Sequence, residues 1–196
     1  IRKQFLENII SESDRLNDLI NDLLDLDQLE NTETVLNTKP KNIKQTLQTA
    51  LKPLHHLIKK KNIDLEVEDF LTQTDFNYDE KRILQVFHNL MGNAIKFCDE
   101  NGIISISLNN TENQLHISIT NSGKPIPEDE LEMIFDKFYQ SKDQNIRKPL
   151  GSGLGLAICK KIIAAHGGAI SAENFERGVM FSFQIPGKRI GEIVKL

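Results

Sequence analysis

The segment HNLMGNAIKF, residues 88–97, restricts the possible fold most, because it places two asparagines four residues apart among apolar side chains. Residues three and four apart share one side of an α-helix, so Asn89, Asn93 and Lys96 should project together. Asparagine lowers helix propensity and competes for backbone hydrogen bonds, so two of them inside a helix need a reason. We therefore expect an amphipathic helix that presents two amide groups and one ammonium group at one place.

A glycine-rich run, GSGLGLAI at residues 151–158, opens directly into a second helical pattern. Glycines allow close backbone approach, and a helix N-terminus presents unpaired N–H groups to anionic oxygens. Amide oxygens suit Mg²⁺, which takes few protein ligands beside substrate phosphates, and Lys96 can offset phosphate charge. Taken singly, solvated surface amides and an ordinary helix start are the alternatives. Together, the two segments indicate a site for a phosphate-bearing ligand and its cation.

Four segments occur in the order found in the ATP-binding domain of sensor histidine kinases, within the superfamily of gyrase, heat-shock chaperones and mismatch-repair ATPases. The chain resembles this family through an N box, NLMGNAIKF (89–97), a G1 box, NSGKPIP (121–127), an F box, FDKFYQ (135–140), and a G2 box, GSGLGLAI (151–158). The resemblance covers almost the whole chain, from Phe5 to about Pro186.

The resemblance implies a role for residues in each box. Asn93 would be the principal Mg²⁺ ligand, Asn89 would lie beside the metal and phosphates, and Lys96 would contact phosphate oxygens. Phe97 lies against the adenine or, alternatively, fills the core. The residues expected to bind ATP are Asn89, Asn93, Lys96, Phe97, Asn121, Gly123, Ile126, Phe138, Lys142, Arg147, Gly151, Ser152, Gly153, Leu154, Gly155 and Leu156, with Asn93 and Asn89 as the metal ligands.

The resemblance also implies an ATP lid over about residues 139–150, a polar stretch without a clear pattern. Phe135 and Phe138 would anchor the start of this lid on the core. Lys142 or Arg147 would reach a phosphate from it, whereas the alternative for each is a solvated loop side chain.

Two positions depart from the pattern of the resembled family. Its G1 box usually begins with an Asp that accepts the adenine amino proton, and here that position is Asn121, which accepts without charge. Pro125 replaces the second glycine of the box and stiffens the loop. Both changes bear on nucleotide affinity and base selectivity.

The residue four positions before Asn93 helps to choose among activities. In the hydrolytic relatives, and in serine kinases that resemble this fold, a Glu at that position serves as general base, whereas Asn89 cannot take a proton at neutral pH. A histidine acceptor needs less help, because neutral imidazole is already a nucleophile. Asn89 therefore favours phosphoryl transfer to histidine over ATP hydrolysis or serine phosphorylation.

Together with Asn89, the resemblance implies a protein-histidine kinase portion that uses Mg-ATP to phosphorylate a histidine on a helical hairpin, for relay to an aspartate of a response regulator receiver domain. The resemblance places that histidine in a motif similar to SHELRTPL, which the sequence lacks, so this chain alone is not expected to autophosphorylate. Its own five histidines are expected to be packing or capping residues. The alternative is a degenerate nucleotide-binding module with a regulatory or docking role, and an ATP hydrolase is disfavoured.

Composition limits the partners. The formal net charge is −4 and the basic residues are dispersed apart from Lys59–Lys61, so no nucleic acid is expected. Cys98 and Cys159 lack metal-ligand spacing and should be buried thiols of a reducing compartment. No apolar run approaches the roughly 20 residues that span a bilayer, and no signal peptide is evident. We therefore expect a cytoplasmic portion without direct membrane contact, compatible with an upstream anchor.

Apolar residues at spacings of three and four predict one long helix over residues 1–30. The resemblance makes it the second helix of a dimerisation and phosphotransfer hairpin and implies a homodimer in the full-length protein. The alternative is a terminal helix packed on its own domain. Residues 31–42 should form a linker with a small strand at Val35–Thr38, and residues 43–190 the ATP-binding domain.

Within that domain, Asn42 marks a helix start, and a helix from about Ile43 to Lys60 should bend near Pro53. Alternating apolar residues predict strands at 63–67, around Phe76, and at 103–108, 115–119 and 179–185. Such a mixture indicates an α+β fold: a two-layer α/β sandwich with a mainly antiparallel mixed sheet covered on one face by helices, plus the long N-terminal helix.

Overall fold

The computed structural model describes residues 2–30, 36–141, 152–176 and 178–187. Its main sheet contains the strands β2 (Asp64–Phe70), β4 (Ile103–Asn110), β5 (Gln114–Ser122), β6 (Ala169–Phe175) and β7 (Gly178–Pro186). They lie in the order β2-β4-β5-β7-β6. The pair β2 and β4 runs parallel, whereas the other neighbouring pairs run antiparallel. The predicted mixed and mainly antiparallel sheet is confirmed.

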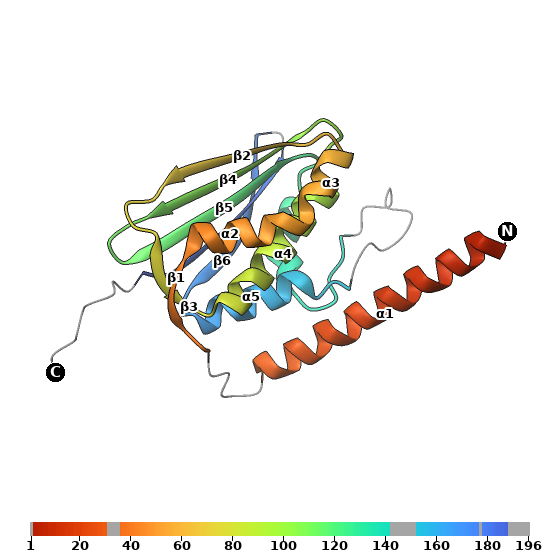
Figure 1. Cartoon of the computed structure of the whole chain (residues 1–196), viewed down its shortest axis with the longest axis horizontal. Coiled ribbons are helices and arrows are strands. Elements are labelled where there is room, and N and C mark those ends of the chain that lie inside the picture. Colours follow the sequence, from red (N-terminus) through yellow and green to blue (C-terminus); the bar gives the residue numbers. More distant parts are fainter. Residues whose placement is uncertain (1, 31–35, 142–151, 177, 188–196) are drawn as a thin grey trace.

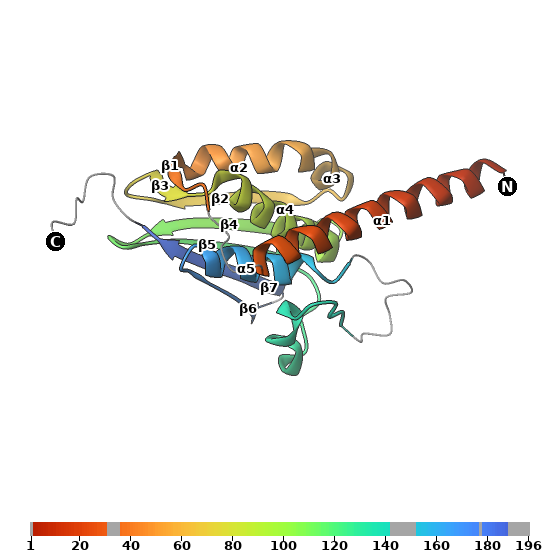
Figure 2. The same cartoon turned by 90° about the horizontal axis from the view of Figure 1, so that it is seen from below.

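Helices cover one face of this sheet, and no described helix covers the other face (Figures 1 and 2). The covering layer is made of α2 (Ile43–Leu51), α4 (Glu80–Phe97) and α5 (Gly155–Ala165). A short 3₁₀ turn, η1 (Lys52–Leu54), joins α2 to α3 (His55–Lys60), so the predicted bend near Pro53 is confirmed. Two further 3₁₀ turns, η2 (Glu128–Glu130) and η3 (Met133–Phe135), precede α5 in the chain. The molecule is the predicted two-layer α+β sandwich.

The core lies between the two layers because the apolar side chains repeat with the period of each element. Along α4 the buried residues Ile83, Phe87, Leu90 and Ala94 recur every three or four positions, whereas alternate residues of the central strands β4 and β5 are buried. The Phe87 ring meets the edge of Phe183 of β7, with ring centroids 5.9 Å apart. This packing fixes α4 against the middle of the sheet.

A second, two-stranded sheet pairs β1 (Lys39–Asn42) with β3 (Asp75–Tyr78). The small strand predicted at Val35–Thr38 is therefore wrong in position: residues 36–38 are not in a strand, and Val35 lies outside the described residues. The partner strand decides the position, because Phe76 and Tyr78 are fully buried and hold β3 in place. β1 then pairs through its backbone rather than through apolar side chains.

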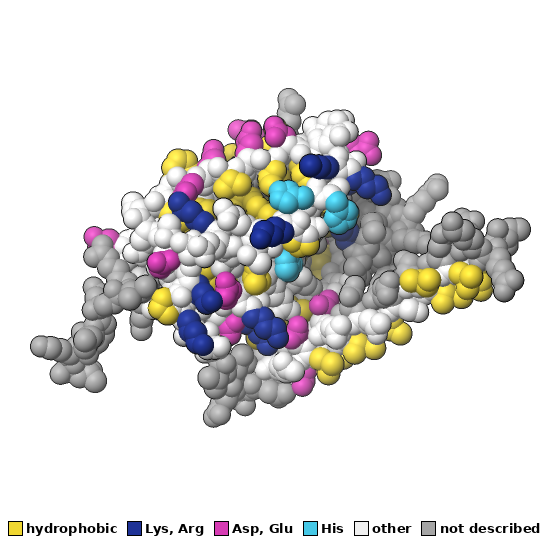
Figure 3. Space-filling model, viewed as in Figure 1, with side chains coloured by type: hydrophobic (Ala, Val, Ile, Leu, Met, Phe, Trp, Pro, Cys, Tyr) yellow, Lys and Arg dark blue, Asp and Glu magenta, His cyan; other side chains and the backbone are white. Residues whose placement is uncertain are grey.

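Helix α1 (Arg2–Glu30) runs along one side of the sandwich and extends beyond it (Figure 1). Near its C-terminal end, Leu26 is buried in the core and Leu29 packs against it. Much of the rest presents apolar side chains to solvent, some of which are visible along α1 in Figure 3. Among the described residues, no helix has the length and apolar content needed to cross a membrane.

Candidate nucleotide site

The N-box helix and the G2 helix meet at the predicted site. Asn89 Nδ2 of α4 donates a 3.1 Å hydrogen bond to the carbonyl oxygen of Gly155, the first residue of α5. Asn93 lies one turn further along α4 and is half-buried, and its side chain forms no hydrogen bond to any described residue. No described side chain caps the N-terminus of α5, and a helix start of this kind can offer its first N–H groups to a ligand. The structure thus brings the two polar segments together, as predicted.

The backbone of the G2 loop packs against the backbone of the F box. Gly153 has φ +72°, and a Cβ there would lie 2.9 Å from the carbonyl carbon of Phe138. The Phe138 N–H donates a 2.9 Å hydrogen bond to the Gly153 carbonyl oxygen. Glycine is therefore required at residue 153, because both the conformation and the close approach exclude a side chain. Leu154, next in the loop, is fully buried, so its side chain is not available to a ligand.

The two aromatic residues of the F box behave differently. Phe135 is buried and meets the edge of Phe181, with ring centroids 6.4 Å apart, so it lies in the core as predicted. The Phe138 ring is 57% exposed, so its predicted side-chain anchoring on the core is wrong. Phe138 has φ +61°, which turns the ring away while its backbone bonds to Gly153. Its anchor is the backbone hydrogen bond.

The C-terminal end of α4 presents Lys96 and Phe97. The Phe97 ring is 46% exposed, which excludes the alternative that it fills the core. Lys96 Nζ lies 4.5 Å from the centroid of this ring, and partial burial lowers the pKa of Lys96. A flat aromatic surface and a cation therefore stand together at the end of this helix.

The G1 segment is tied to the same end of α4. At Gly123, φ is +151° and a Cβ would overlap the Phe97 carbonyl oxygen. Asn121 is only 2% exposed, and its Nδ2 donates a 3.2 Å hydrogen bond to the Ser122 carbonyl oxygen. Its Oδ1 is therefore directed away from that carbonyl and accepts no hydrogen bond from the described residues.

A residue outside the four boxes holds the G1 loop. Asn174 of β6 accepts a 2.9 Å hydrogen bond from Ile126 N–H through Oδ1 and donates a 2.8 Å bond to the Ile126 carbonyl oxygen. Sequence reasoning did not single out Asn174, because nothing in its surroundings in the sequence links β6 to the G1 loop. Leu156, in the first turn of α5, is half-buried. Three predicted ligand residues, Lys142, Arg147 and Gly151, and most of the predicted lid lie outside the described residues.

Helix α1 also reaches this site, which the sequence did not predict. Ser152 Oγ of the G2 loop donates a 2.7 Å hydrogen bond to Asp22 Oδ2. One turn further on, Asp25 accepts a 3.1 Å hydrogen bond from Arg82 Nη1 and a 2.9 Å bond from Gln85 Nε2. The residues of α1 and their partners are separated by dozens of residues in the chain, and no local sequence pattern predicts these contacts.

The cysteines are structural residues, whereas the histidines differ from one another in their exposure. Cys159 and Cys98 are buried, as predicted, and burial raises the pKa of the Cys159 thiol to about 12. His166 is hydrogen-bonded at the end of α5, whereas His55 and His56 are exposed on α3. Within the described ranges, no three His, Cys, Asp or Glu side chains gather as a metal cluster. A cation at this site would therefore depend on amide oxygens and ligand phosphates.

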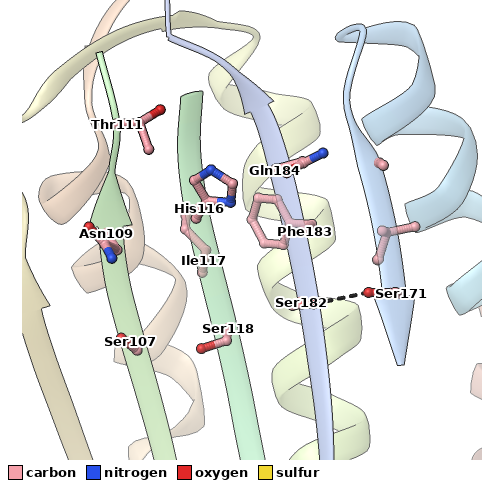
Figure 4. Close-up of a pocket in the computed structure, with 12 residues that line it drawn as sticks. Ser107, Asn109, Thr111, His116, Ile117, Ser118, Ser171, Ser182, Phe183 and Gln184 are labelled. Atoms are coloured by element: carbon pink, nitrogen blue, oxygen red, sulfur yellow. Dashed lines mark hydrogen bonds between the residues drawn. The ribbon is translucent and has the colours of Figure 1, made fainter. Parts of the chain in front are cut away.

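The open face of the sheet carries a separate hollow of about 530 Å³ (Figure 4). Serines lie side by side across β4, β5, β7 and β6 in this hollow, and Ser171 and Ser182 are hydrogen-bonded at 3.0 Å. Its described lining residues include no Asp, Glu, Lys or Arg. The hollow lies on the face opposite the helices, and it is not part of the site described above.

The fold and site define a class: an α+β sandwich whose helical layer holds the start of helix α5 beside the amide groups of α4. The chain belongs to the histidine kinase-, DNA gyrase B- and HSP90-like ATPase family, whose sequence profile matches residues 78–189. This confirms the resemblance carried by the four boxes and the expectation of an ATP-binding catalytic domain.

The relatives are sensor histidine kinases. Sensor histidine kinase WalK of Bacillus subtilis is 32% identical over 195 residues, which cover 96% of this chain and 31% of WalK. The catalytic domain of histidine kinase ThkA is 38% identical with a TM-score of 0.70, covering 78% of this chain and 99% of that one. ThkA in complex with the response regulator protein TrrA is 34% identical with a TM-score of 0.78, covering 95% and 51%. The chain thus spans about a third of WalK.

Proposed function

We propose that the chain is the catalytic portion of a sensor histidine kinase, which binds Mg-ATP and presents the γ-phosphoryl group to a histidine. The contact between Asn89 and Gly155 carries this proposal, together with Asn93 one turn away, whose side chain has no hydrogen-bond partner among the described residues. In the transfer, an imidazole nitrogen attacks the γ-phosphorus while the bond to the departing ADP breaks. Positioning and charge stabilisation supply most of the catalysis in such reactions.

The residues of the site fit a bound magnesium ion. Asn93 Oδ1 is the proposed ligand, with Asn89 beside it, because oxygen donors and few protein ligands suit this ion. Magnesium would neutralise phosphate charge when bound. Lys96, at the end of the same helix, would contact the phosphate oxygens. Since Asn89 cannot accept a proton at neutral pH, the site favours a histidine acceptor over water.

Adenine recognition is proposed for the region of Asn121 and Phe97. The Asn121 Oδ1 would accept a hydrogen bond from the adenine amino group, because its Nδ2 is already engaged by Ser122. The exposed Phe97 ring would lie against the base. Gly123 and Ile126 would line the approach, while the backbone of residues 151–156 would hold the phosphates.

Helix α1 is proposed as the second helix of a dimerisation and phosphotransfer hairpin. An apolar surface on an exposed helix needs a partner, and the first helix of the hairpin and a second copy would supply it. The exposed apolar side chains on α1 are Phe5, Leu6, Ile9, Ile10, Leu16, Ile20, Leu23 and Leu24. The phosphorylated histidine of this hairpin would then pass its phosphoryl group to a response regulator aspartate. The crystal structure of ThkA in complex with the response regulator protein TrrA supports this step. Because it consumes ATP, the domain is proposed to act on the cytoplasmic side.

Calorimetric titration with ADP and a non-hydrolysable ATP analogue, with and without Mg²⁺, tests the proposal. We expect magnesium-dependent binding that is lost in Asn93→Ala. Asn109→Ala is the matched control, because Asn109 is an exposed asparagine of β4 outside the site, and this variant should bind as the wild type does. Equal binding by Asn93→Ala and the wild type would contradict the metal role.

A second function, a degenerate nucleotide-binding module that docks or regulates, is favoured by one observation. The neutral Asn121 stands where the family usually has a charged acceptor, and Pro125 stiffens the loop beside it. Absence of nucleotide binding in the wild type would support this function over the kinase.

A further inference from the structure

Helix α1 places a carboxylate at the edge of the proposed phosphate site. Asp22 Oδ2 accepts a 2.7 Å hydrogen bond from Ser152 Oγ, and the same hydroxyl oxygen accepts a 3.1 Å bond from Leu154 N–H. Leu154 immediately precedes Gly155, where α5 begins. One serine side chain therefore separates the Asp22 carboxylate from the backbone N–H groups that would bind phosphate.

Neighbouring contacts hold this carboxylate in position. Asp25 is bound by Arg82, whose side chain is only 13% exposed, and by Gln85 of the same helix α4. At the end of α1, Glu30 pairs with Lys137 at 2.7 Å and with Lys161 at 3.4 Å. With Leu26 buried between these points, the last third of α1 is docked on α4 and α5, and Asp22 cannot move away without breaking these contacts.

We propose that Asp22 opposes the binding of nucleotide phosphates, so that docking of the last third of α1 and nucleotide binding are negatively coupled. Two negative groups within a few ångströms repel, and partial burial reduces the screening by salt. The coupling is reciprocal, because a ligand that is weakened by a docked helix must in turn weaken the docking. This inference rests on the proposed function, since it concerns the phosphates of the same ligand.

The charge of Asp22, rather than its hydrogen bond, carries the effect. An asparagine at this position would still accept the bond from Ser152 Oγ, and its side chain has almost the same shape. A purely structural role for Asp22 would therefore survive the change to asparagine, whereas electrostatic opposition would disappear.

The test compares the wild type with Asp22→Asn in titrations with adenosine, ADP and a non-hydrolysable ATP analogue, all with Mg²⁺. Loss of one negative charge should tighten binding of the ATP analogue by about fivefold, ADP by less, and adenosine not at all. The gain should shrink at high salt. Asp27→Asn, which removes the same charge from an exposed position on the same helix, should change none of these affinities by as much.

Three outcomes would overturn the inference: unchanged or weaker binding in Asp22→Asn, an equal gain for adenosine, or an equal gain in Asp27→Asn. Hydrogen exchange gives a second reading, because the ATP analogue should speed exchange over residues 22–30 in the wild type and less so in Asp22→Asn. If all variants bind nucleotide alike, the proposed function stands and the inference fails. If none binds, the proposed function fails and the inference with it.

Discussion

His166, at the end of α5, accepts a 3.1 Å hydrogen bond through Nε2 from the backbone N–H of Asp79. Its Nδ1 lies 2.8 Å from the Ile162 carbonyl oxygen, so the proton of the neutral ring is on Nδ1. The Asp79 side chain caps α4 by accepting from Arg82 N–H at 3.2 Å. One imidazole thus joins the end of the G2 helix to the start of the N-box helix.

The unfolding free energy should decrease as the pH is lowered, because the His166 ring must stay neutral in the folded protein. Burial lowers the pKa of His166 below its ordinary value of 6.5, although its bond to the Ile162 carbonyl and the nearby Asp79 act in the opposite direction. The unfolded chain therefore binds the proton more readily than the folded chain. The contribution of His166 is complete above about pH 6.5 and is lost as the pH falls through the lowered pKa. Urea unfolding at pH 7.5, 6.5 and 5.5 should record this loss.

His166→Gln, which cannot titrate, should be less stable at pH 7.5 and lose less of its remaining stability on acidification. His55→Gln is the control, because it removes an exposed ring from α3 and should keep the pH dependence of the wild type. An unchanged slope in His166→Gln would place the acid sensitivity in other groups.

Lys61 stabilises the C-terminal end of α4. Its Nζ donates hydrogen bonds to the carbonyl oxygens of Ile95, Lys96 and Cys98 at 2.8, 3.0 and 3.0 Å. A cation there satisfies terminal carbonyls and opposes the negative end of the helix dipole. Lys61→Met should therefore lower the unfolding free energy by about 1–2 kcal/mol, as measured by urea denaturation.

The neighbouring lysine supplies the comparison for that variant. Lys60 is exposed and has no ion pair among the described residues, so Lys60→Met should change stability by less than about 0.5 kcal/mol. Equal effects of the two substitutions would show that the cap contributes nothing. The sequence identified Lys59–Lys61 only as a basic run, because the carbonyls that Lys61 contacts lie more than 30 residues away in the chain.

The sequence predicted those parts of the fold that local patterns specify. The period of α4, the helix start at Asn42, the bend at Pro53 and the β4–β5 hairpin each follow from nearby residues, and the structure has all four. The predicted position of β1 was wrong because Lys39–Asn42 has no strand pattern and becomes a strand by pairing with β3. The exposure of the Phe138 ring was not predicted, because Phe138 has a positive φ and bonds through its backbone to Gly153, which is distant in the sequence.

The residues of the candidate site also divide into those that the sequence predicted and those that it did not. The boxes located Asn89 and Gly155 in the sequence, and in the fold Asn89 Nδ2 lies 3.1 Å from the Gly155 carbonyl oxygen. Asp22 and Asn174 could not be found, because each reaches the site through a tertiary contact that leaves no periodic or spacing signal. Family resemblance supplies roles for boxes, whereas contacts between boxes and the rest of the chain depend on packing.

Gly123 is expected to be intolerant of substitution. Gly123→Ala would place a methyl group against the Phe97 carbonyl oxygen at a φ of +151°, so we expect a loss of roughly 1–3 kcal/mol in unfolding free energy. Gly92→Ala is a control of opposite sign, because a Cβ at this exposed helical position meets nothing within 4 Å. It should stabilise the protein by about 0.5–1 kcal/mol. Thermal unfolding of the two variants would separate these cases, and a neutral Gly123→Ala would contradict the tight junction.

Asn121→Asp should tighten adenine nucleotide binding and destabilise the unliganded protein. The carboxylate would form a charge-assisted hydrogen bond with the adenine amino group, about twice as strong as that of a neutral acceptor, which corresponds to roughly fivefold tighter binding. Without nucleotide, the same carboxylate would be buried at a position only 2% exposed and would face the Ser122 carbonyl oxygen instead of donating to it. The melting temperature should therefore fall without ligand and recover with ADP.

The amide of Asn121 can also turn to donate to the O6 of guanine, which a carboxylate cannot do, so the preference for ADP over GDP should rise in the variant. Parallel titrations with both nucleotides would measure this preference, and an unchanged ratio would indicate that residue 121 does not contact the base.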